Sequence, residues 1–309
     1  MTAPDEQPYR SGFACLVGRP NAGKTTLTNA MVGTKVGIVS NRPQTTRHAI
    51  RGVLTRPGGQ LVLVDTPGLH KPRSLLGRRL NDVVRDTLAD VDVIVFCIPA
   101  DQPVGTGDRF IARQLQEFRA PVVVVVTKTD AASKKQVAEQ LMAASRLVDA
   151  AEVVPVSAVA GDQVELLEDL LVRLLPEGPP MYPEEQLTDD DVERQIAELI
   201  REAALEKVRQ EVPHSLAVTV EELIRRPDPK REGAELVEVH ALLHVERQTQ
   251  KPMLLGRGGE MIKTIGTAAR QELERFFDAR VFLDLHVKVK GEWREDERVL
   301  DELLKRPGE

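Results

Sequence analysis

The chain has 309 residues, of which 41% are hydrophobic and 29% are charged, and this length favours two domains over one compact core. The formal net charge of −6 and the pI of about 5.7 argue against a protein that coats nucleic acid by bulk charge, although a local basic surface is compatible with them. The N-terminus lacks the apolar core of a signal peptide, and the longest apolar run, Val122 to Val126, is too short to cross a bilayer, so we expect a cytoplasmic protein.

Short apolar runs alternate with amphipathic segments in the first half of the chain. The expected strands are residues 13–18, 61–65, 91–98, 121–127 and 152–157, with helical spacing between them. Strands that alternate with helices form a parallel sheet with both faces covered. We therefore predict an α/β domain over residues 10–176 with a mostly parallel sheet. Cys15 and Cys97 lie inside two of these runs, which indicates buried thiols and a reducing compartment.

A phosphate-binding motif follows the first expected strand. Residues 18–25, GRPNAGKT, satisfy the pattern G-x-x-x-x-G-K-[ST] between a strand and a helix, which is the context that this motif requires. The glycines allow backbone N–H groups to surround the β-phosphate, while Lys24 supplies charge to the β- and γ-phosphates and Thr25 offers its hydroxyl to Mg²⁺. The residues expected to bind nucleotide here are Gly18, Asn21, Ala22, Gly23, Lys24, Thr25 and Thr26.

A second phosphate motif is DTPG, residues 65–68, at the end of another expected strand. Asp65 would reach Mg²⁺ through water, and the Gly68 N–H would contact the γ-phosphate. Taken alone, this tetrapeptide is also a common turn. Its position between the P-loop and a base motif favours the nucleotide role.

The base is indicated by TKTD, residues 127–130, after a run of five valines. A carboxylate at Asp130 can accept hydrogen bonds from N1–H and the 2-amino group of guanine, whereas adenine has no such donor pair. Lys128 would lie over the ring. Thr127 stands where many GTPases have asparagine, and its hydroxyl would meet N7 or tie down the P-loop. The remaining residues expected at the base are Ser157 and Ala158, near O6. For a lone T-K-x-D the alternative is a helix N-cap.

Residues 40–48, SNRPQTTRH, together with GRPNAGKTT and DTPGLHKP, resemble the Era family of GTPases, and the similarity extends through essentially the whole chain. The resemblance implies that QTTR is switch I, and that Thr46, with Thr45 as the alternative, caps Mg²⁺ when the γ-phosphate is present. It places Lys24, Thr46 and Gly68 at the catalytic centre, with Thr25, Thr46 and Asp65 around the metal.

Two residues near the phosphates bear on the rate of hydrolysis. Leu69 follows the DTPG glycine where Ras-like GTPases place a glutamine that orients the attacking water, so another element must supply that role. Asn21 matches the asparagine with which some relatives hold K⁺. A potassium-stimulated reaction is one hypothesis, and the alternative is that Asn21 simply suits the turn.

The second half begins after a proline-rich and acidic stretch, which we predict to be a linker over residues 177–189. The expected elements beyond it are a helix over 191–212, strands over 216–223 and 234–247, a helix from about 260 to 277, and a strand over 281–289. A short apolar turn and GRGG, residues 256–259, precede the helix over 260–277, and the order is helix, two strands, two helices, strand. This order resembles a type II KH domain, an α+β fold, which we assign to residues 190–309.

The resemblance implies that the GRGG turn approaches the backbone of single-stranded RNA while bases lie along an apolar groove. Residues 251–294 hold nine basic and six acidic residues, so phosphate contacts should be few. The candidate RNA-binding residues are Gly256, Arg257, Gly258, Gly259, Lys263, Lys288 and Lys290. Since Gly258 makes the turn less basic than the GNKG-like loops of the family, Arg257 is expected to carry its phosphate contact alone.

Apolar side chains in this half are expected to form the core. Ile262, Ile265, Phe276 and Phe277 have helical spacing, which is typical of packing rather than of base stacking. Trp293 is expected to pack against the last strand, with base stacking as the alternative.

The combined reading is a GTP-hydrolysing switch that uses GTP/GDP, Mg²⁺ and, as a hypothesis, K⁺. The Era resemblance implies binding to 16S ribosomal RNA near its 3′ end and a step in 30S subunit assembly, with no role for DNA. One alternative is an RNA-binding assembly factor with negligible turnover. Another is a GTPase held weakly at the inner face of the cell membrane.

Overall fold

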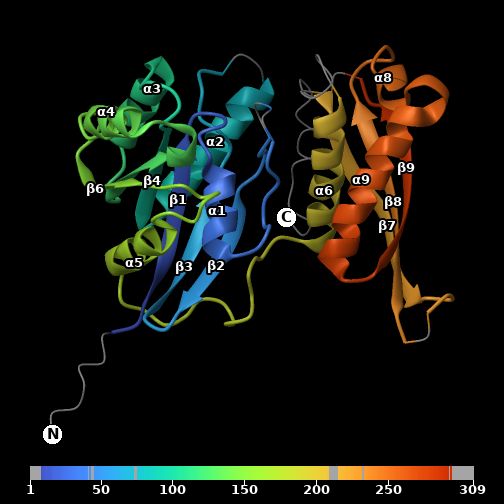
Figure 1. Cartoon of the computed structure of the whole chain (residues 1–309), viewed down its shortest axis with the longest axis horizontal. Helices are drawn as coiled ribbons and strands as arrows, with labels where there is room; N and C mark the ends of the chain where they lie inside the picture. The colour runs from blue at the N-terminus through green and yellow to red at the C-terminus, as the bar shows by residue number, and fades with distance from the viewer. Residues whose placement is uncertain are drawn as a thin grey trace, which may run out of the picture. The chain divides into compact units, whose positions relative to one another are not determined.

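The computed structural model describes residues 8–40, 42, 45–72, 75–208, 215–231, 233–291 and 293 (Figure 1). It divides into two compact units. The first contains Met1–Gly37, Gln44–Arg73 and Gly77–Asp189, and the second contains Ile38–Pro43, Ser74–Leu76 and Asp190–Glu309. Within the described residues, no helix is long and apolar enough to cross a membrane.

The first unit is built on a six-stranded sheet in the order β2-β3-β1-β4-β5-β6. Its strands are β1 (Arg10–Gly18), β2 (Ile50–Arg56), β3 (Gly59–Asp65), β4 (Val93–Pro99), β5 (Val122–Thr127) and β6 (Ala150–Pro155). All neighbouring strands are parallel except β2, which runs antiparallel to β3. The mostly parallel α/β sheet is therefore confirmed, and β2 is a strand that the apolar runs did not reveal.

Helices cover both faces of this sheet because its strands are apolar on both sides. The helices are α1 (Lys24–Val32), α2 (Leu75–Ala89), α3 (Thr106–Leu115), α4 (Lys134–Ala144) and α5 (Val164–Leu174). Leu16 of β1 packs in a core with Leu27 and Leu171, whereas its neighbour Cys15 packs in the opposite core. Both cysteines are free and buried, as expected, and burial raises the pKa of the Cys97 thiol to about 12.

The segment predicted as a linker is hydrogen-bonded to the first unit over much of its length. The Gly178 N–H donates to the Tyr9 carbonyl at 3.1 Å, and Gln60 Nε2 donates to the Tyr182 carbonyl at 2.9 Å. Near its end, the Val53 N–H of β2 donates to the Leu187 carbonyl at 2.9 Å. Residues 176–189 therefore form a strap that runs onto the outer edge of β2.

The second unit combines a three-stranded sheet with helices. Its elements are α6 (Val192–Lys207), β7 (Ala217–Pro227), β8 (Glu235–Val245), α8 (Lys251–Leu255), the 3-10 turn η2 (Arg257–Gly259), α9 (Glu260–Phe277) and β9 (Arg280–Val289). In the order β7-β8-β9, β7 is antiparallel and β9 parallel to β8. Figure 1 shows α6 and α9 side by side against these strands. This is the α+β order predicted for the second domain.

Alternation along the strands separates a packed face from an open one. Val237, Val239 and Ala241 of β8 are buried in one core with Ile265 of α9. Trp293 is fully buried, and its Nε1–H donates to the Ser215 carbonyl at 3.0 Å. The residue is therefore buried rather than exposed for base stacking, and its packing against the last strand stays a prediction. The first helix of this unit, predicted over residues 191–212, ends earlier, at Lys207, because the next residue, Val208, is extended with φ −88° and ψ 153°. Residues 209–214 and the chain after residue 293 lie outside the described residues.

Candidate functional site: a phosphate loop and an apolar groove

The phosphate loop connects the end of β1 to the start of α1. A Cβ on Gly18 would lie 2.6 Å from the Cys97 carbonyl oxygen, so a larger residue would push the loop away from β4. Gly23 has φ +85°, and Asn21 also lies in the left-handed region with φ 62°. Glycine and asparagine are the residues that adopt this conformation most readily. The loop sequence is therefore suited to its turns before any ligand is considered.

Lys24, the first residue of α1, is oriented by two carbonyl groups of the same loop. Its Nζ donates to the Gly18 oxygen at 3.4 Å and to the Arg19 oxygen at 3.2 Å. An ammonium group has three N–H donors, so one remains for a phosphate oxygen. Burial lowers the pKa of Lys24, although the nearby Asp65 opposes this shift. A bound polyphosphate would favour the charged form.

Three residues predicted around the metal converge although they come from α1, the segment before β2, and the end of β3. Thr25 Oγ1 lies 2.5 Å from Asp65 Oδ2 and 3.1 Å from Thr46 Oγ1. The Oδ1 atom of Asp65 is buried and has no hydrogen-bond partner among the described residues. Burial raises the pKa of this carboxyl group. A hard cation with its water would satisfy the free oxygen and offset the burial, so this oxygen set fits Mg²⁺.

The DTPG motif packs directly on the phosphate loop. A Cβ on Gly68 would lie 2.6 Å from the Pro20 nitrogen, so only glycine fits here. The Leu69 N–H donates to the Gly18 carbonyl at 3.1 Å, and the Leu69 side chain is 1% exposed. A buried aliphatic side chain cannot orient a water molecule. The structure thus places Leu69 in the core, away from the role that glutamine has in Ras-like GTPases.

The guanine motif lies at the end of β5. Asp130, in the turn η1 (Thr129–Ala131), is exposed, and its Oδ1 accepts a 2.6 Å hydrogen bond from Ser157 Oγ. Ser157 is itself fixed, since its Oγ accepts from the Ala160 N–H at 3.0 Å. Lys128 Nζ lies 3.7 Å from the Asp101 carboxylate. The exposed Asp130 carboxylate and the Lys128 side chain thus both follow the end of β5, where a base can approach.

A groove in the second unit lies between α9 and β9. Its lining includes Ile262, Lys263, Gly266 and Arg270 from α9. Across it lie Val281, Leu283 and Leu285 of β9. Its floor is apolar and two cationic side chains flank it, a combination that suits the bases and phosphates of a single strand. The predicted Lys263 belongs to this groove.

The GRGG turn comes directly before α9, which forms one side of this groove. Arg257 and Gly258 of the turn are both exposed. Gly256, Gly258 and Gly259 have φ of +72°, +62° and +85°. A Cβ on Gly256 would lie 2.7 Å from the Met261 nitrogen, whereas nothing lies within 4 Å of one on Gly258. The turn therefore requires glycine at Gly256 for space, but only for backbone conformation at Gly258.

Not all predicted RNA-binding residues share this surface. Lys288 is exposed beside the buried Val287, and side chains alternate along a strand, so it lies on the open face of the sheet. Phe282 lies on that same face, 51% exposed, with its ring 6.1 Å from that of His240. Lys290 follows the end of β9.

The residues expected in the core differ in how far they are buried. Ile265 is fully buried, Ile262 and Phe277 are partly buried and pack against the core, and Phe276 is 36% exposed. Ile262 also lines the groove. The core assignment was thus wrong for Phe276 alone. The reason is that helical spacing marks a wide apolar stripe, and its margins face a groove or solvent. The four-residue spacing of Ile262, Gly266 and Arg270 was the signal that could have revealed the groove.

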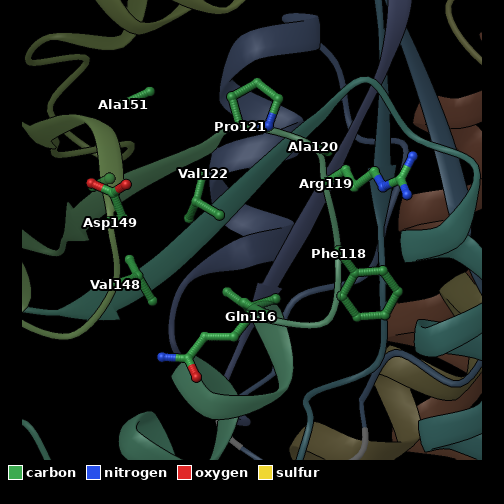
Figure 2. Close-up of a pocket in the computed structure, with 11 residues that line it drawn as sticks. Gln116, Phe118, Arg119, Ala120, Pro121, Val122, Val148, Asp149 and Ala151 are labelled. Carbon is green, nitrogen blue, oxygen red and sulfur yellow. The ribbon is translucent and has the colours of Figure 1, made fainter.

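A further pocket of about 420 Å³ lies at the other end of the first sheet (Figure 2). It is lined by the Phe118–Val122 segment leading into β5 and by Val148–Ala151 leading into β6. The nucleotide motifs follow the ends of β1, β3 and β5, so this pocket is distinct from them. Figure 2 shows Asp149 and Arg119 on separate segments of its wall, and neither belongs to a motif that predicts chemistry.

Known proteins resemble the chain in both halves. A family model described as 50S ribosome-binding GTPase matches residues 13–128, and one described as KH domain matches residues 211–294. GTPase Era of Streptomyces coelicolor is 55% identical over 306 residues, covering 97% of this chain and 96% of that protein. GTPase Era of Mycobacterium avium is 55% identical over 298 residues, covering 96% of this chain and 98% of that protein.

Two solved structures have the same fold over nearly the full length. Era in complex with MgGDPNP and nucleotides 1506–1542 of 16S ribosomal RNA gives a TM-score of 0.89 at 33% identity, covering 96% of this chain and 98% of that one. A variant of Aquifex aeolicus Era bound to GDP·AlF4⁻ gives a TM-score of 0.87 at 33% identity, covering 95% and 98%. The two units described above thus occur together in these relatives.

Proposed function

The chain belongs to the Era family of GTPases, and from this premise we propose that it hydrolyses GTP to GDP and phosphate and that its nucleotide state controls binding to small-subunit ribosomal RNA during 30S assembly. The observation that carries the proposal is the convergence of Thr25, Thr46 and Asp65 in a chain that also has a KH groove. Relatives are known with a GTP analogue and 16S ribosomal RNA, and with GDP·AlF4⁻.

We propose that Mg²⁺ is held by the Thr25 and Thr46 hydroxyls and, through water, by Asp65. Of the two switch I threonines, Thr46 is favoured because its hydroxyl lies 3.1 Å from that of Thr25. The metal would neutralise charge that develops on the β- and γ-phosphate oxygens, while the remaining N–H of Lys24 donates to them. Phosphate release from saturating GTP should require Mg²⁺ and should fall by at least about 100-fold in Lys24→Met. Equal release by both proteins would contradict this role.

The use of K⁺ is a separate proposal that rests on Asn21. Its positive φ gives asparagine a conformational reason to occupy this position, so only a functional test separates the two readings. Asn21→Gly keeps the left-handed turn accessible and removes the amide oxygen. We expect faster hydrolysis in KCl than in NaCl for the natural chain and equal rates for Asn21→Gly. Equal rates for the natural chain would remove the proposal.

For the RNA partner, we propose a single strand from the 3′ end of 16S ribosomal RNA in the α9–β9 groove. Support comes from the apolar floor, from Lys263 and Arg270 beside it, and from the RNA-bound relative. Binding of a short RNA from this region should exceed that of DNA with the same sequence, because the 2′-hydroxyl distinguishes the two. Equal affinities would contradict selection of RNA.

The strap offers a physical link through which the bound nucleotide could affect the second unit. Switch I leads into β2, and the last strap residues are held on β2 by Arg51 Nη1, which lies 2.7 Å from Asp189 Oδ2. The chain then continues into α6. We expect RNA affinity at fixed salt to differ between GDP and a non-hydrolysable GTP analogue, and this ratio to shrink in Arg51→Ala but not in the exposed control Arg173→Ala. Equal affinities with both nucleotides would mean that the units act independently.

Two alternatives remain as hypotheses with their own tests. An assembly factor with negligible turnover is favoured by the buried Leu69, and single-turnover hydrolysis separates it from an active GTPase.

For location we propose the cytoplasm, which suits two buried free thiols. Peripheral association with the inner face of the membrane would appear as co-flotation with anionic liposomes.

A further inference from the structure

A fully buried carboxylate lies beside the phosphate loop but outside every nucleotide motif. Asp108, in the first turn of α3, is 0% exposed. Its Oδ1 accepts a 2.8 Å hydrogen bond from Arg19 Nε, and its Oδ2 accepts one of 2.8 Å from the Gly105 N–H. A buried charge is costly unless it is paired and hydrogen-bonded. Both oxygens of Asp108 are satisfied, and one of them holds a P-loop residue.

Arg19 makes a second hydrogen bond on the α3 side of the loop. Its Nη1 lies 3.3 Å from Gln102 Oε1, and the Gln102 carbonyl in turn accepts from Gln140 Nε2 at 3.0 Å. A Cβ on Gly107 would lie 2.9 Å from Arg19 Cδ. The absence of a side chain at Gly107 therefore lets the arginine lie directly over the first turn of α3.

The backbone of the same arginine orients the catalytic lysine. The Arg19 carbonyl accepts from Lys24 Nζ at 3.2 Å and from the Ala22 N–H at 3.2 Å. The side chain of Arg19 is thus anchored on α3 while its carbonyl fixes one of the three directions of the Lys24 ammonium. A shift of Arg19 would change where the remaining Lys24 N–H points.

We propose that Asp108 is a positioning residue for GTP hydrolysis and that it acts through Arg19 on Lys24. The inference rests on the proposed GTPase function and adds α3 to the elements that set its rate. Charge on the transferring phosphoryl group and the leaving oxygen changes most in the transition state. A displaced ammonium therefore costs more in the transition state than in the ground state, so the rate should change more than the affinity.

The test compares Asp108→Asn with Asp169→Asn, a matched change at an exposed residue of α5. We measure the single-turnover rate of GTP hydrolysis and the dissociation constant of a non-hydrolysable GTP analogue. In Asp108→Asn the rate should fall about 10- to 100-fold, the range expected for a misplacement of about 1 Å. The dissociation constant should change by less than about threefold, and Asp169→Asn should match the natural chain in both measurements.

A second pair of variants separates positioning from stability. Arg19→Met leaves the Asp108 carboxylate buried without its cationic partner, so the melting temperature should fall. In the double variant Arg19→Met/Asp108→Asn both charges are gone, so the melting temperature should recover while hydrolysis stays slow. A natural rate in either Asp108→Asn or the double variant would overturn the inference. If the natural chain itself does not hydrolyse GTP, the proposed function fails and the inference fails with it. If the natural chain hydrolyses GTP and the variants do so at the same rate, the inference alone is overturned.

Discussion

The Thr127 hydroxyl donates a 2.6 Å hydrogen bond to the Ala22 carbonyl, and this contact joins the end of β5 to the phosphate loop. Thr127 is buried, and its side chain lies 3.5 Å from the point where a Cβ on Gly23 would stand. The residue that replaces the asparagine of many GTPases therefore ties down the P-loop. This is one of the two roles expected for it from the sequence.

Removing this hydroxyl should weaken nucleotide binding. Thr127→Val keeps the shape of the side chain but leaves the Ala22 carbonyl without its partner, at a cost of about 1–2 kcal/mol. We expect the dissociation constant of GDP to rise about 5- to 30-fold. Thr127→Ser keeps the hydroxyl and should bind GDP nearly as the natural chain does. Fluorescent GDP titration measures both, and tight binding by Thr127→Val would show that the tie is dispensable.

Asp130 should determine which base is bound. Asp130→Asn replaces one acceptor oxygen with an NH2 donor, which opposes the guanine 2-amino group but matches the 2-oxo group of xanthine. GDP affinity should fall at least about 100-fold, since hydrogen bonds to a charged group contribute about 1.5–3 kcal/mol each. Xanthosine diphosphate should bind better than GDP. Ser157→Ala removes the hydrogen bond that orients Asp130 and the acceptor of the Ala160 N–H, and it should weaken GDP binding without this exchange of preference. Unchanged preference in Asp130→Asn would place base selection elsewhere.

The nucleotide half was the more predictable half because its signals are local. Lys24 and Asp130 each belong to a motif that follows a run of buried apolar residues, and parallel strands bring such ends to one edge of a sheet. The strand β2 gave no such signal, since Ile50–Arg56 mixes apolar residues with Arg51 and Thr55. Its conformation depends on pairing with β3, which is a tertiary contact.

The second half was predictable in its elements but not in its surfaces. The predicted helix over 260–277 matches α9, because its amphipathic period is long and regular. Ile262 packs against the core and also lines the groove. The second role depends on how closely β9 approaches α9, and the sequence does not show that distance directly. Arg19 and Asp108 escaped notice for a similar reason, since 89 residues separate them along the chain.

The Asp228–Arg280 pair should make the second unit sensitive to acid. The Asp228 carboxylate accepts the Lys230 N–H at 2.9 Å and lies 2.8–2.9 Å from Arg280 Nη1, and these contacts lower its pKa. Because the pKa of this carboxyl group is lower in the folded state, the ionised carboxylate stabilises the fold at pH values above the unfolded-state pKa of about 3.9. This contribution is lost as the pH falls through the folded-state pKa.

Urea unfolding of Asp228→Asn should therefore show a lower midpoint than that of the natural chain at about pH 6, and the difference should shrink below about pH 4. Glu274→Gln removes the exposed ion pair in which Glu274 Oε1 lies 3.9 Å from Arg270 Nε, and it should change the urea midpoint little. A difference for Asp228→Asn that is independent of pH would show that the ionised carboxylate is not the stabilising form.

The GRGG turn should bind phosphate through Arg257, and an added cation should strengthen it. Gly258→Lys places its side chain in open space at φ +62°, at a backbone cost of about 1–2 kcal/mol. We expect RNA affinity to rise. The slope of the logarithm of the binding constant against the logarithm of the salt concentration should steepen by the amount expected for about one more phosphate contact. Arg257→Ala should lower affinity and flatten the slope, while Lys135→Ala, on α4 of the first unit, should do neither. Identical salt slopes for all four proteins would remove the turn from the interface.

Filling the groove should block RNA without harming the GTPase. A Cβ on Gly266 would lie 3.6 Å from Leu285 Cδ1, an ordinary contact, so Gly266→Ala should be tolerated and should stabilise α9 by up to about 1 kcal/mol. Gly266→Met extends into the space where bases are expected and should weaken RNA binding at least about tenfold. Thr264→Met adds the same side chain on α9 outside the groove lining and should bind RNA normally. GTP hydrolysis without RNA should be equal in all three variants, because none of them alters a nucleotide motif. If Gly266→Met binds RNA as well as Thr264→Met does, the bases do not occupy the space between α9 and β9.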